Sequence, residues 1–476
     1  MRYLEIFKQL NAIPRPSHHE ERVADFLCDF ATRLGLEYDR DAQNCVVIRK
    51  PATPGHENAT PIVILNHMDM VCVAEPGKSF DPLNDPIEAY TDGEWMRARG
   101  TSLGADNGIG LSMALAILED DNIVHGPLEV ITTTNEEDGM TGASALSPDF
   151  IKGRKVINLD SEDYDTITTG AAGAYLQIHH LPLNCVTAPN TKLSWFNIDI
   201  SGGRGGHSGV DINKGRASAT TLMWALLSAI GDDDIVNLAD LDIGNASASI
   251  ASQAHAVICV EEGDAAQTIK AREDHFNEWL REEYGETDPG VRCRITPAEP
   301  RKHIISSDDV DALLTALEQI PQGVVAMSNE MPDTVETSNN VGRITTEKNE
   351  FTISTHTRSF IENDMIKLGE EIKEIFAQEG ASTELIMSAP AWQENQHSDF
   401  LKLTSDTFND VLGWRPRMVA MHFVLEAGFF VQKYPGIEMA SIGPRIVEPH
   451  STSEHVNLNT CSDIWKVTIE LLRRLA

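Results

Sequence analysis

The chain contains PIVIL (61–65), GIGLSMALAIL (108–118) and LEVITTT (128–134), which are two apolar strand-like runs on either side of a helix-like segment. A third strand-like run, KVINLD (155–160), follows them. Strands that alternate with helices along a chain usually lie parallel in one sheet, with the helices on its faces. The pattern therefore predicts an α/β domain whose sheet is mostly parallel and covered by helices.

A different pattern occupies the middle of the chain. Polar and apolar residues alternate in LQIHHLPL (176–183), WFNIDISGG (195–203), AVICVEEG (256–263) and FTISTHTRSF (351–360), with helix-like segments near 214–230 and 308–319. This alternation indicates an antiparallel sheet with helices. The α/β pattern returns with MASIGP (439–444) and a final helix at 459–475. We therefore expect a catalytic domain at 1–172 and 384–476, with an α+β lid domain inserted at 173–383.

Composition excludes several classes of protein. The chain has 476 residues, with 38 Lys and Arg against 73 Asp and Glu, a formal net charge of −35. Such an excess of carboxylates argues against nucleic-acid and anionic-membrane partners, since both require a basic surface. No run approaches the ~18 apolar residues of a membrane span, so a cytoplasmic location is expected. The seven cysteines are scattered without a CxxC pair, so any bound metal needs histidine and carboxylate ligands.

Two motifs with potential ligands follow predicted strands or precede a helix. In NHMDMV (66–71), His67 and Asp69 lie two residues apart, so an extended backbone would place both on one face of the sheet. A carboxylate that holds one nitrogen of a histidine is typical of metal sites, although a buried His–Asp pair of the core has the same pattern. In GTSLGADNGIG (100–110), Asp106 and Asn107 precede the helix. They could be simple helix caps, but the flanking glycines indicate a special backbone geometry.

Three more positions complete the set. TTTNEEDGM (132–140) ends a strand with Glu136 and Glu137, which would point in opposite directions if the backbone stays extended. INLDSED (157–163) ends another strand with Asp160, and His450 lies in the loop after MASIGP. Each motif alone could be a surface turn. Together, the two histidines and three carboxylates suit two divalent ions, Zn²⁺ foremost, with one carboxylate bridging them. The five candidate ligands are His67, Asp106, Glu137, Asp160 and His450.

These motifs resemble those of the bacterial aminoacyl-histidine dipeptidases, the peptidase D or carnosinase type of the di-zinc aminoacylase and glutamate-carboxypeptidase-like superfamily. The resemblance extends over nearly the whole chain and also includes NAIPRPSHHEERVADFL (11–27), SGGRGGHSG (201–209), VETSNNVG (335–342) and GPRIVEPHSTSEHV (443–456). It implies a metallopeptidase that hydrolyses unblocked dipeptides, including those that end in histidine. It also implies two Zn²⁺ ions, with Co²⁺ or Mn²⁺ as alternatives.

The resemblance assigns a role to each catalytic position. Asp106 would bridge two ions, with His67 and Asp160 at one of them and Glu137 and His450 at the other. Asp69 would orient His67, and Glu136 would be the general base for a water that the metal ions activate. The family also implies a cis peptide between Asp106 and Asn107. His455 is a rival for the role of His450, but the spacing to Glu454 favours His450.

The inserted domain supplies the remaining candidates. By resemblance, His207 would donate a hydrogen bond to the oxyanion, and Asn340 and Arg358 would bind the substrate carboxylate. Without the family, His207 could be an exposed loop residue and Arg358 a strand residue in a salt bridge. A homodimer formed through the lid is an alternative to a monomer, so His207 could act in its own subunit or in the other.

One segment departs from the family. Its usual sequence, similar to HAGLECG, is here HFVLEAG (422–428), with larger residues near the pocket for the leaving residue. That difference leaves the preference for histidine open. Two other functions also fit the motifs: an N-acyl-amino-acid deacylase of the same superfamily, and a catalytically silent binding protein that retains the fold.

Overall fold

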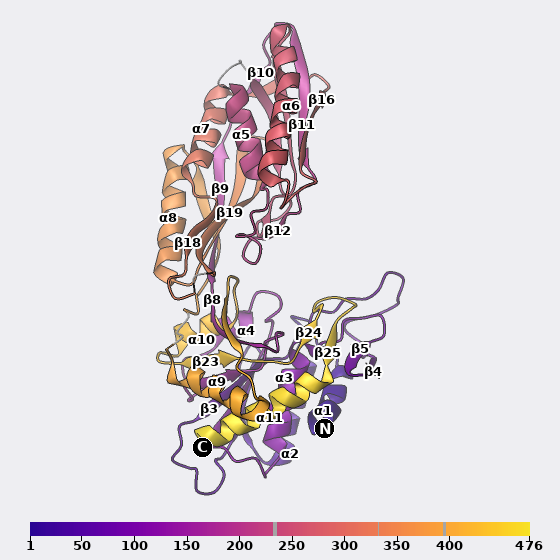
Figure 1. Cartoon of the computed structure of the whole chain (residues 1–476), viewed down its shortest axis with the longest axis vertical. Helices are drawn as coiled ribbons and strands as arrows, with labels where there is room; N and C mark the ends of the chain where they lie inside the picture. Colours follow the sequence, from indigo (N-terminus) through magenta and orange to yellow (C-terminus); the bar gives the residue numbers. More distant parts are fainter. Residues whose placement is uncertain (232–235, 332, 394–396) are drawn as a thin grey trace. The chain divides into compact units, whose positions relative to one another are not determined.

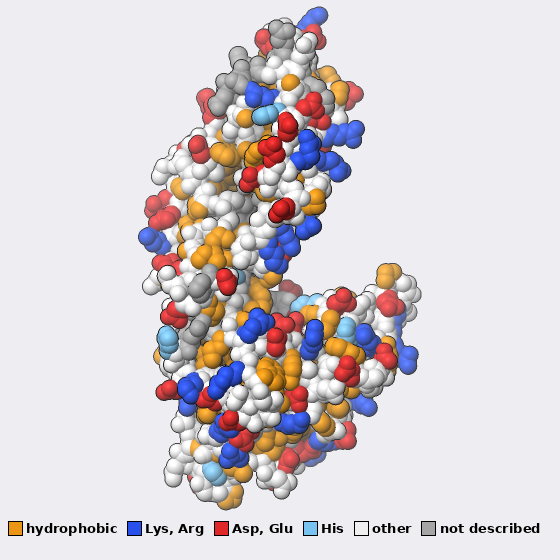
Figure 2. Space-filling view, viewed as in Figure 1, with side chains coloured by type: hydrophobic (Ala, Val, Ile, Leu, Met, Phe, Trp, Pro, Cys, Tyr) orange, Lys and Arg blue, Asp and Glu red, His pale blue; other side chains and the backbone are white. Residues whose placement is uncertain are grey.

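The computed structural model describes residues 1–231, 236–331, 333–393 and 397–476, which form two compact units (Figure 1). Unit 1 comprises 1–170, 394–420 and 426–476, and unit 2 comprises 171–393 and 421–425. Among the described residues, every helix is too short or too polar to span a lipid bilayer. On the face drawn in Figure 2, acidic side chains are spread among basic ones over both units, as expected for a carboxylate-rich chain.

Unit 1 is built on an eight-stranded sheet with a parallel centre. The central strands, in order, are β6 (Leu128–Thr133), β3 (Ile62–His67), β7 (Lys155–Asn158) and β23 (Glu438–Ser441). The outer strands are β2 (Val46–Lys50) and β1 (Glu37–Arg40) beside β6, and β8 (Thr166–Ala171) and β22 (Arg417–Met421) beside β23. The pairs β1–β2, β2–β6 and β23–β8 are antiparallel. The apolar runs of the sequence therefore form the centre of a mixed sheet.

Some helices of unit 1 contact this sheet directly, and others pack on those helices. They are α1 (Arg2–Asn11), α2 (Glu21–Leu34), α3 (Ala105–Glu119), α9 (Asp399–Leu412) and α11 (Leu458–Leu475), with the short α4 (Thr141–Ala145) and α10 (Ala427–Lys433). Residues 105–118 of α3 are all buried, in keeping with the all-round apolar sequence of this helix. By contrast, α11 is amphipathic and is capped by Asn457, whose side chain accepts hydrogen bonds from Asn459 N and Thr460 N.

A small antiparallel sheet completes unit 1. Its order is β24 (Ile446–Val447), β25 (His455–Asn457), β5 (Trp95–Ala98) and β4 (Ala89–Asp92). The loop between β24 and β25 carries His450. This sheet therefore joins a late segment of the chain to the segment just before α3.

Unit 2 has its own core around a nine-stranded sheet in which all the strand pairs described are antiparallel. The strand order is β16 (Arg292–Pro297), β11 (Leu193–Ser201), β15 (Ala254–Glu261), β13 (Asn237–Ile243), β19 (Val335–Thr346), β20 (Glu350–Ser359), β9 (Gly173–Pro182) and β21 (Ser382–Ala389), with β18 (Gly323–Met327) also paired to β19. Two-stranded sheets pair β10 (Cys185–Thr187) with β17 (His303–Ile305) and β12 (Gly206–His207) with β14 (Ser249–Ile250).

In the described part of unit 2, the helices that pack on the sheet are α5 (Ala219–Gly231), α6 (Asp264–Tyr284), α7 (Ser307–Gln319) and α8 (Glu362–Gln378). In α8, the buried residues Met365, Leu368, Ile372 and Phe376 follow helical spacing and form one apolar stripe. The segments that the sequence suggested as helices near 214–230 and 308–319 correspond to α5 and α7.

The register of the unit 1 sheet brings several chain segments to one edge. His67 lies opposite Thr133 in the β3–β6 pair, and Asn158 lies opposite Leu65 in the β3–β7 pair and Ser441 in the β7–β23 pair. The carboxyl ends of these four parallel strands therefore meet, as they do at the binding edge of open α/β sheets. The segments that follow them carry the candidate site residues.

Candidate metal centre

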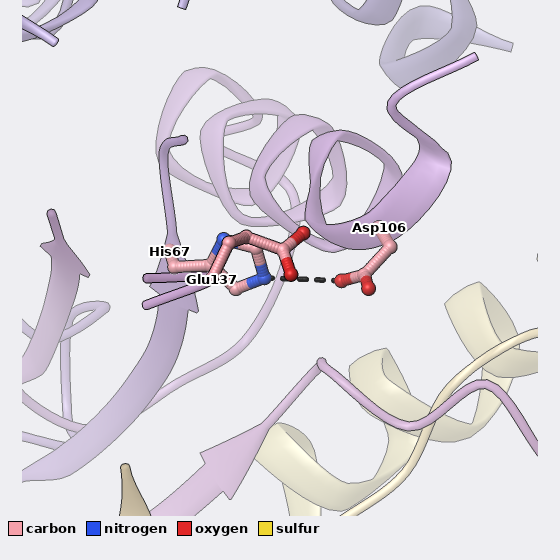
Figure 3. Close-up of side chains that lie close together, drawn as sticks. All are labelled: His67, Asp106 and Glu137. Carbon is pink, nitrogen blue, oxygen red and sulfur yellow. Dashed lines mark hydrogen bonds and ion pairs between the residues drawn. The ribbon is translucent and has the colours of Figure 1, made fainter. Parts of the chain in front are cut away.

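Five side chains meet at this edge of the unit 1 sheet. His67 Nε2 lies 3.0 Å from Asp106 Oδ1 and 3.1 Å from Asp160 Oδ1. His450 Nε2 lies 3.1 Å from Asp106 Oδ2 and 2.8 Å from Glu137 Oε2. Figure 3 shows His67, Asp106 and Glu137 pointing toward one another. All five candidate ligands from the sequence are thus brought together.

Asp106 occupies the centre of this cluster. Its two carboxylate oxygens contact different histidines, Oδ1 facing His67 and Oδ2 facing His450. The cluster therefore divides into two groups that share one carboxylate. One group is His67 with Asp160, and the other is His450 with Glu137.

The loop that leads into α3, and the non-helical start of α3 that carries Asp106, are held from two distant parts of the chain. The buried carboxylate of Glu454 accepts the backbone N–H groups of Leu103, Gly104 and Ala105 at 2.7–2.9 Å. The fully buried guanidinium of Arg15 donates to Gly104 O at 2.7 Å. These bonds satisfy buried backbone N–H and C=O groups that have no partner within a helix or strand. The expected cis peptide between Asp106 and Asn107 is present.

Asp69 organises the segment that carries the two glutamates. Its carboxylate lies 3.5 Å from His67 Nδ1, and it accepts hydrogen bonds from Ser17 Oγ at 2.8 Å and from the N–H groups of Glu136 and Glu137 at 3.1 and 3.2 Å. Strand β3 ends at His67. Asp69 thus reaches His67 from the irregular segment after the strand and not from an extended strand.

The expected backbone at Glu136 and Glu137 is wrong. Strand β6 ends at Thr133, and both glutamates lie in a turn that begins after Asn135, whose φ is +54°. The N–H of Asn135 is bound by the buried carboxylate of Glu20 at 2.9 Å. The chain therefore leaves the sheet before the glutamates, and Asp69 fixes both by their N–H groups.

His450 and its rival His455 have different surroundings. His450 lies in a loop with φ of +57°, a conformation that non-glycine residues adopt mainly where the surroundings impose it. His455 is in β25, where its Nδ1 contacts Ser453 O at 2.7 Å and its ring lies edge-on to Trp95. His450 alone of the two joins the cluster.

The carboxylates make both histidines more basic. Burial would lower the pKa of His67, but the charges and hydrogen bonds of Asp160, Asp106 and Asp69 outweigh burial and raise that pKa well above its usual value. Hydrogen bonds to Asp106 and Glu137 raise the pKa of His450 to about 11. The cluster therefore attracts positive charge strongly.

Three carboxyls around the cluster are harder to ionise than usual. Burial is the largest cause of the raised pKa of Glu136, Glu137 and Asp160, and neighbouring carboxylates add to it. Like charges held this closely in a buried site repel each other unless cations compensate them.

The residues present fit a pair of divalent ions. Two ligands of one tetrahedral zinc, each about 2 Å from the ion, are separated by ~3.3 Å, close to the His–carboxylate distances seen here. Within the described part of the chain, Oε1 of Glu137 is buried and has no hydrogen-bond partner, and its side chain is only 5% exposed. An imidazole and carboxylate set with one shared carboxylate matches the ligands that zinc and similar ions use.

The site also contains groups that the sequence did not assign. Glu162 lies beside Asp106 and His450, and burial followed by the charges of Asp106 and Asp160 raises its pKa to about 8. Glu426 is 1% exposed and binds Thr133 Oγ1 at 2.7 Å. Both follow apolar runs in the sequence and look there like ordinary turn or helix-start residues. The sequence feature that could have indicated them is their place in the motifs INLDSED and HFVLEAG.

In unit 2, Arg358 is part of a basic cluster. Its guanidinium is 3% exposed and donates to Ser208 Oγ at 3.3 Å. Two further histidines, His356 and His422, are buried nearby. Burial lowers the pKa of both, and the charge of Arg358 lowers it further. His422 Nε2 lies 2.7 Å from Ser338 Oγ. A buried cation among neutral imidazoles is suited to hold an anion.

His207 and Asn340, also in unit 2, have different bonding. His207 Nδ1 accepts the N–H groups of Gly209 and Val210 at 3.1 Å, so the proton of the neutral ring is on Nε2, which is a donor. Burial and the charge of Arg358 lower the pKa of His207, which favours this neutral form. Asn340 is fully buried, and its Nδ2 donates to Ser247 O and Ser249 O at 3.2 and 2.9 Å.

Sequence comparison assigns the family. A profile described as Peptidase family M20/M25/M40 matches residues 63–475. The chain belongs to this family. Over 471 residues, it is 34% identical to the cytosol non-specific dipeptidase of Escherichia coli (strain K12), covering 99% of this chain and 97% of that relative. The resemblance drawn from the motifs is confirmed, and so is the prediction that the chain is an enzyme that cleaves peptide bonds.

Solved structures agree with the fold. The crystal structure of aminoacylhistidine dipeptidase from Vibrio alginolyticus matches 99% of this chain and 96% of that chain, with a TM-score of 0.93 and 32% identity. Aminopeptidase PepT from Bacillus cereus matches with a TM-score of 0.61 at 17% identity, which supports the fold alone. The predicted fold class, an α/β catalytic part with an antiparallel α+β insertion, is confirmed.

Proposed function

We propose that this chain is a cytoplasmic di-zinc dipeptidase that hydrolyses unblocked dipeptides, with those ending in histidine among its substrates. The observation that carries the proposal is Asp106, whose two oxygens contact His67 and His450. The names of the two relatives that cover nearly the whole chain, a cytosol non-specific dipeptidase and an aminoacylhistidine dipeptidase, support the substrate class and the compartment.

Each ion would have its own ligands. His67 and Asp160 would hold one, Glu137 and His450 would hold the other, and Asp106 would bridge them. When bound, two divalent ions supply Lewis acidity for attack on the peptide carbonyl. Asp69 would keep His67 in place and, through the N–H groups of Glu136 and Glu137, fix both glutamates relative to the imidazole.

Glu136 is the residue proposed to move protons. It would accept a proton from the attacking water and deliver it to the departing amine. Burial, with the charges of Asp160 and Glu426, raises the pKa of Glu136. A carboxyl whose pKa is raised holds the proton that it accepts more firmly and can return it later in the same turnover.

We propose that unit 2 is the lid that binds the rest of the substrate. Arg358 would pair with the free C-terminal carboxylate, since its buried guanidinium has only a hydroxyl, Ser208 Oγ, as a described partner. His207 would donate from Nε2 to the oxyanion. The family resemblance also assigns Asn340 to the substrate carboxylate. Because its amide already donates to Ser247 O and Ser249 O, we propose that it acts by holding the 247–249 segment. A homodimer through unit 2 is part of this proposal, with His207 acting in its own or the other subunit.

A deacylase of the same superfamily would use the same ions and Glu136, so the substrate decides between the two functions. The test is a panel of ordinary and histidine-ending dipeptides beside acetyl- and succinyl-amino acids, assayed with zinc and then with a chelator. We expect hydrolysis of unblocked dipeptides that the chelator abolishes and zinc restores. Faster hydrolysis of the acylated amino acids would show that the chain is a deacylase and not a dipeptidase. If no substrate is hydrolysed with any divalent ion, the chain is a binding protein.

A further inference from the structure

Glu162 lies against one half of the metal centre. A carboxylate oxygen of Glu162, one of Asp106 and a ring nitrogen of His450 all lie within 4.8 Å of one another. Glu162 is partly buried, whereas the next residue, Asp163, is exposed. Of the two acidic residues that end INLDSED, Glu162 therefore lies at the metal centre and Asp163 faces solvent.

The backbone fixes Glu162 beside the segment that leads to His450. Ile442 N donates to Asn158 O at 2.9 Å, and Ile446 N donates to Glu162 O at 3.0 Å. Between these bonds, a Cβ on Gly443 would lie 1.7 Å from Ser161 O, so the two backbones touch. The position of Glu162 next to His450 is thus set by main-chain contacts on both sides.

A second observation indicates a cation in this half of the centre. Oε1 of Glu137 is buried and has no hydrogen-bond partner among the residues that the structure describes, while Oε2 contacts His450. An unpaired carboxylate oxygen is costly in a buried site unless a cation binds it. Adding Glu162 gives this half four possible ligands, namely one imidazole and three carboxylates.

We propose that Glu162 is a further ligand of the ion held by His450, Glu137 and Asp106. This inference rests on the proposed di-metal function and makes the two halves unequal. The His450 half has four protein ligands, as in sites that retain their metal, and the His67 half has three, as in sites that keep a position open for substrate or water. The two ions then bind with different affinities, the His450 ion more tightly.

The test is a zinc titration of the metal-free protein by calorimetry, with a competing chelator, for wild type, Glu162→Gln and the matched control Asp163→Asn. Both variants replace a carboxyl group by an amide, at adjacent positions. We expect the tighter of two binding steps to weaken by at least ~10-fold in Glu162→Gln, with the other step unchanged and both steps unchanged in the control.

Glu162→Asp separates ligation from charge, because it keeps the carboxylate but shortens the side chain. It is expected to weaken the same step and is the second variant if Glu162→Gln does not fold. If both Glu162 variants bind two zinc ions with wild-type affinities, or if both binding steps weaken equally, Glu162 is not the proposed ligand. The di-metal proposal would remain intact. A wild-type protein that binds fewer than two ions would instead overturn the di-metal proposal and the inference together.

Discussion

Asp106 shows how much of the site depends on single residues. One carboxylate contacts two histidines that lie 39 residues before it and 344 residues after it. The sequence allowed the five clustered residues to be found because each follows a strand or precedes a helix, and parallel strands end at one edge. Glu454, Arg15 and Glu20 could not be found in that way, since they act by binding backbone groups of distant segments.

Glu136→Gln should separate catalysis from metal binding. The amide keeps the size of the side chain but cannot accept the proton, so kcat should fall by ~10²–10⁴-fold. Dipeptide hydrolysis and zinc content measured on the same preparation check this. Unchanged zinc content is the control, and unchanged kcat would remove Glu136 from the mechanism.

Phe423 should influence which leaving residues are accepted. Its ring lies edge-on to His207 at 6.2 Å between centroids, at a position where the family usually has a small residue. Phe423→Ala should raise kcat/KM for dipeptides with bulky C-terminal residues by ~10-fold relative to C-terminal glycine, because a ring is removed beside the proposed oxyanion donor. An equal change for bulky and small residues would indicate a general loss of packing.

At the scale of elements, most of the ligands lie outside the strands: Glu137 and His450 are in turns, Asp160 is in the irregular segment after β7, and Asp106 is at the non-helical start of α3. Sequence patterns identified the central strands β3, β6 and β7, because buried parallel strands are apolar throughout. They did not identify where β6 ends, since Asn135 leaves the sheet through a backbone bond with Glu20 that is remote in sequence. Ligand geometry is therefore set by contacts between loops, which local patterns do not encode.

Glu454→Ala should destabilise the loop that carries Asp106. Three backbone N–H groups at 2.7–2.9 Å would lose a buried acceptor, so the free energy of unfolding should fall by about 3 kcal/mol or more. Urea unfolding of the metal-free protein measures the change. Glu318→Ala, at an exposed position of α7, is the control and should leave stability unchanged.

Gly443→Ala should separate the two backbones that hold Glu162 and His450. The new methyl group would overlap Ser161 O, so one segment must move, at a cost of ~1–3 kcal/mol of stability. Zinc affinity should fall as well, because the segments that carry Glu162 and His450 would shift relative to each other. A variant with wild-type stability and wild-type zinc affinity would show that this contact is dispensable.

For the whole molecule, the carboxylate cluster links stability to metal and pH. Burial raises the pKa of Glu162 and Glu426 from 4.5 to about 8. In this interval these two carboxyls bind more protons in the folded metal-free protein than in the unfolded chain, so their contribution to stability falls as pH rises. Divalent ions oppose that loss because they bind the deprotonated site and no such site exists in the unfolded chain.

The increase in Tm caused by zinc should therefore grow between about pH 5 and about pH 8. Thermal unfolding with zinc and with chelator at several pH values measures it. The chelated protein provides the reference at each pH, which cancels titrations elsewhere in the molecule. An increase in Tm that is constant or shrinks over this range would contradict the electrostatic account.

The two clamps on Gly104 have a consequence for the order of events during synthesis. Arg15 binds its carbonyl and Glu454 binds its N–H group. During translation Arg15 is made early. Glu454 follows only after more than four hundred further residues, shortly after His450. We expect a nascent or C-terminally clipped chain to be inert toward peptides, so that peptide-cleaving capacity arises only once translation has passed Glu454.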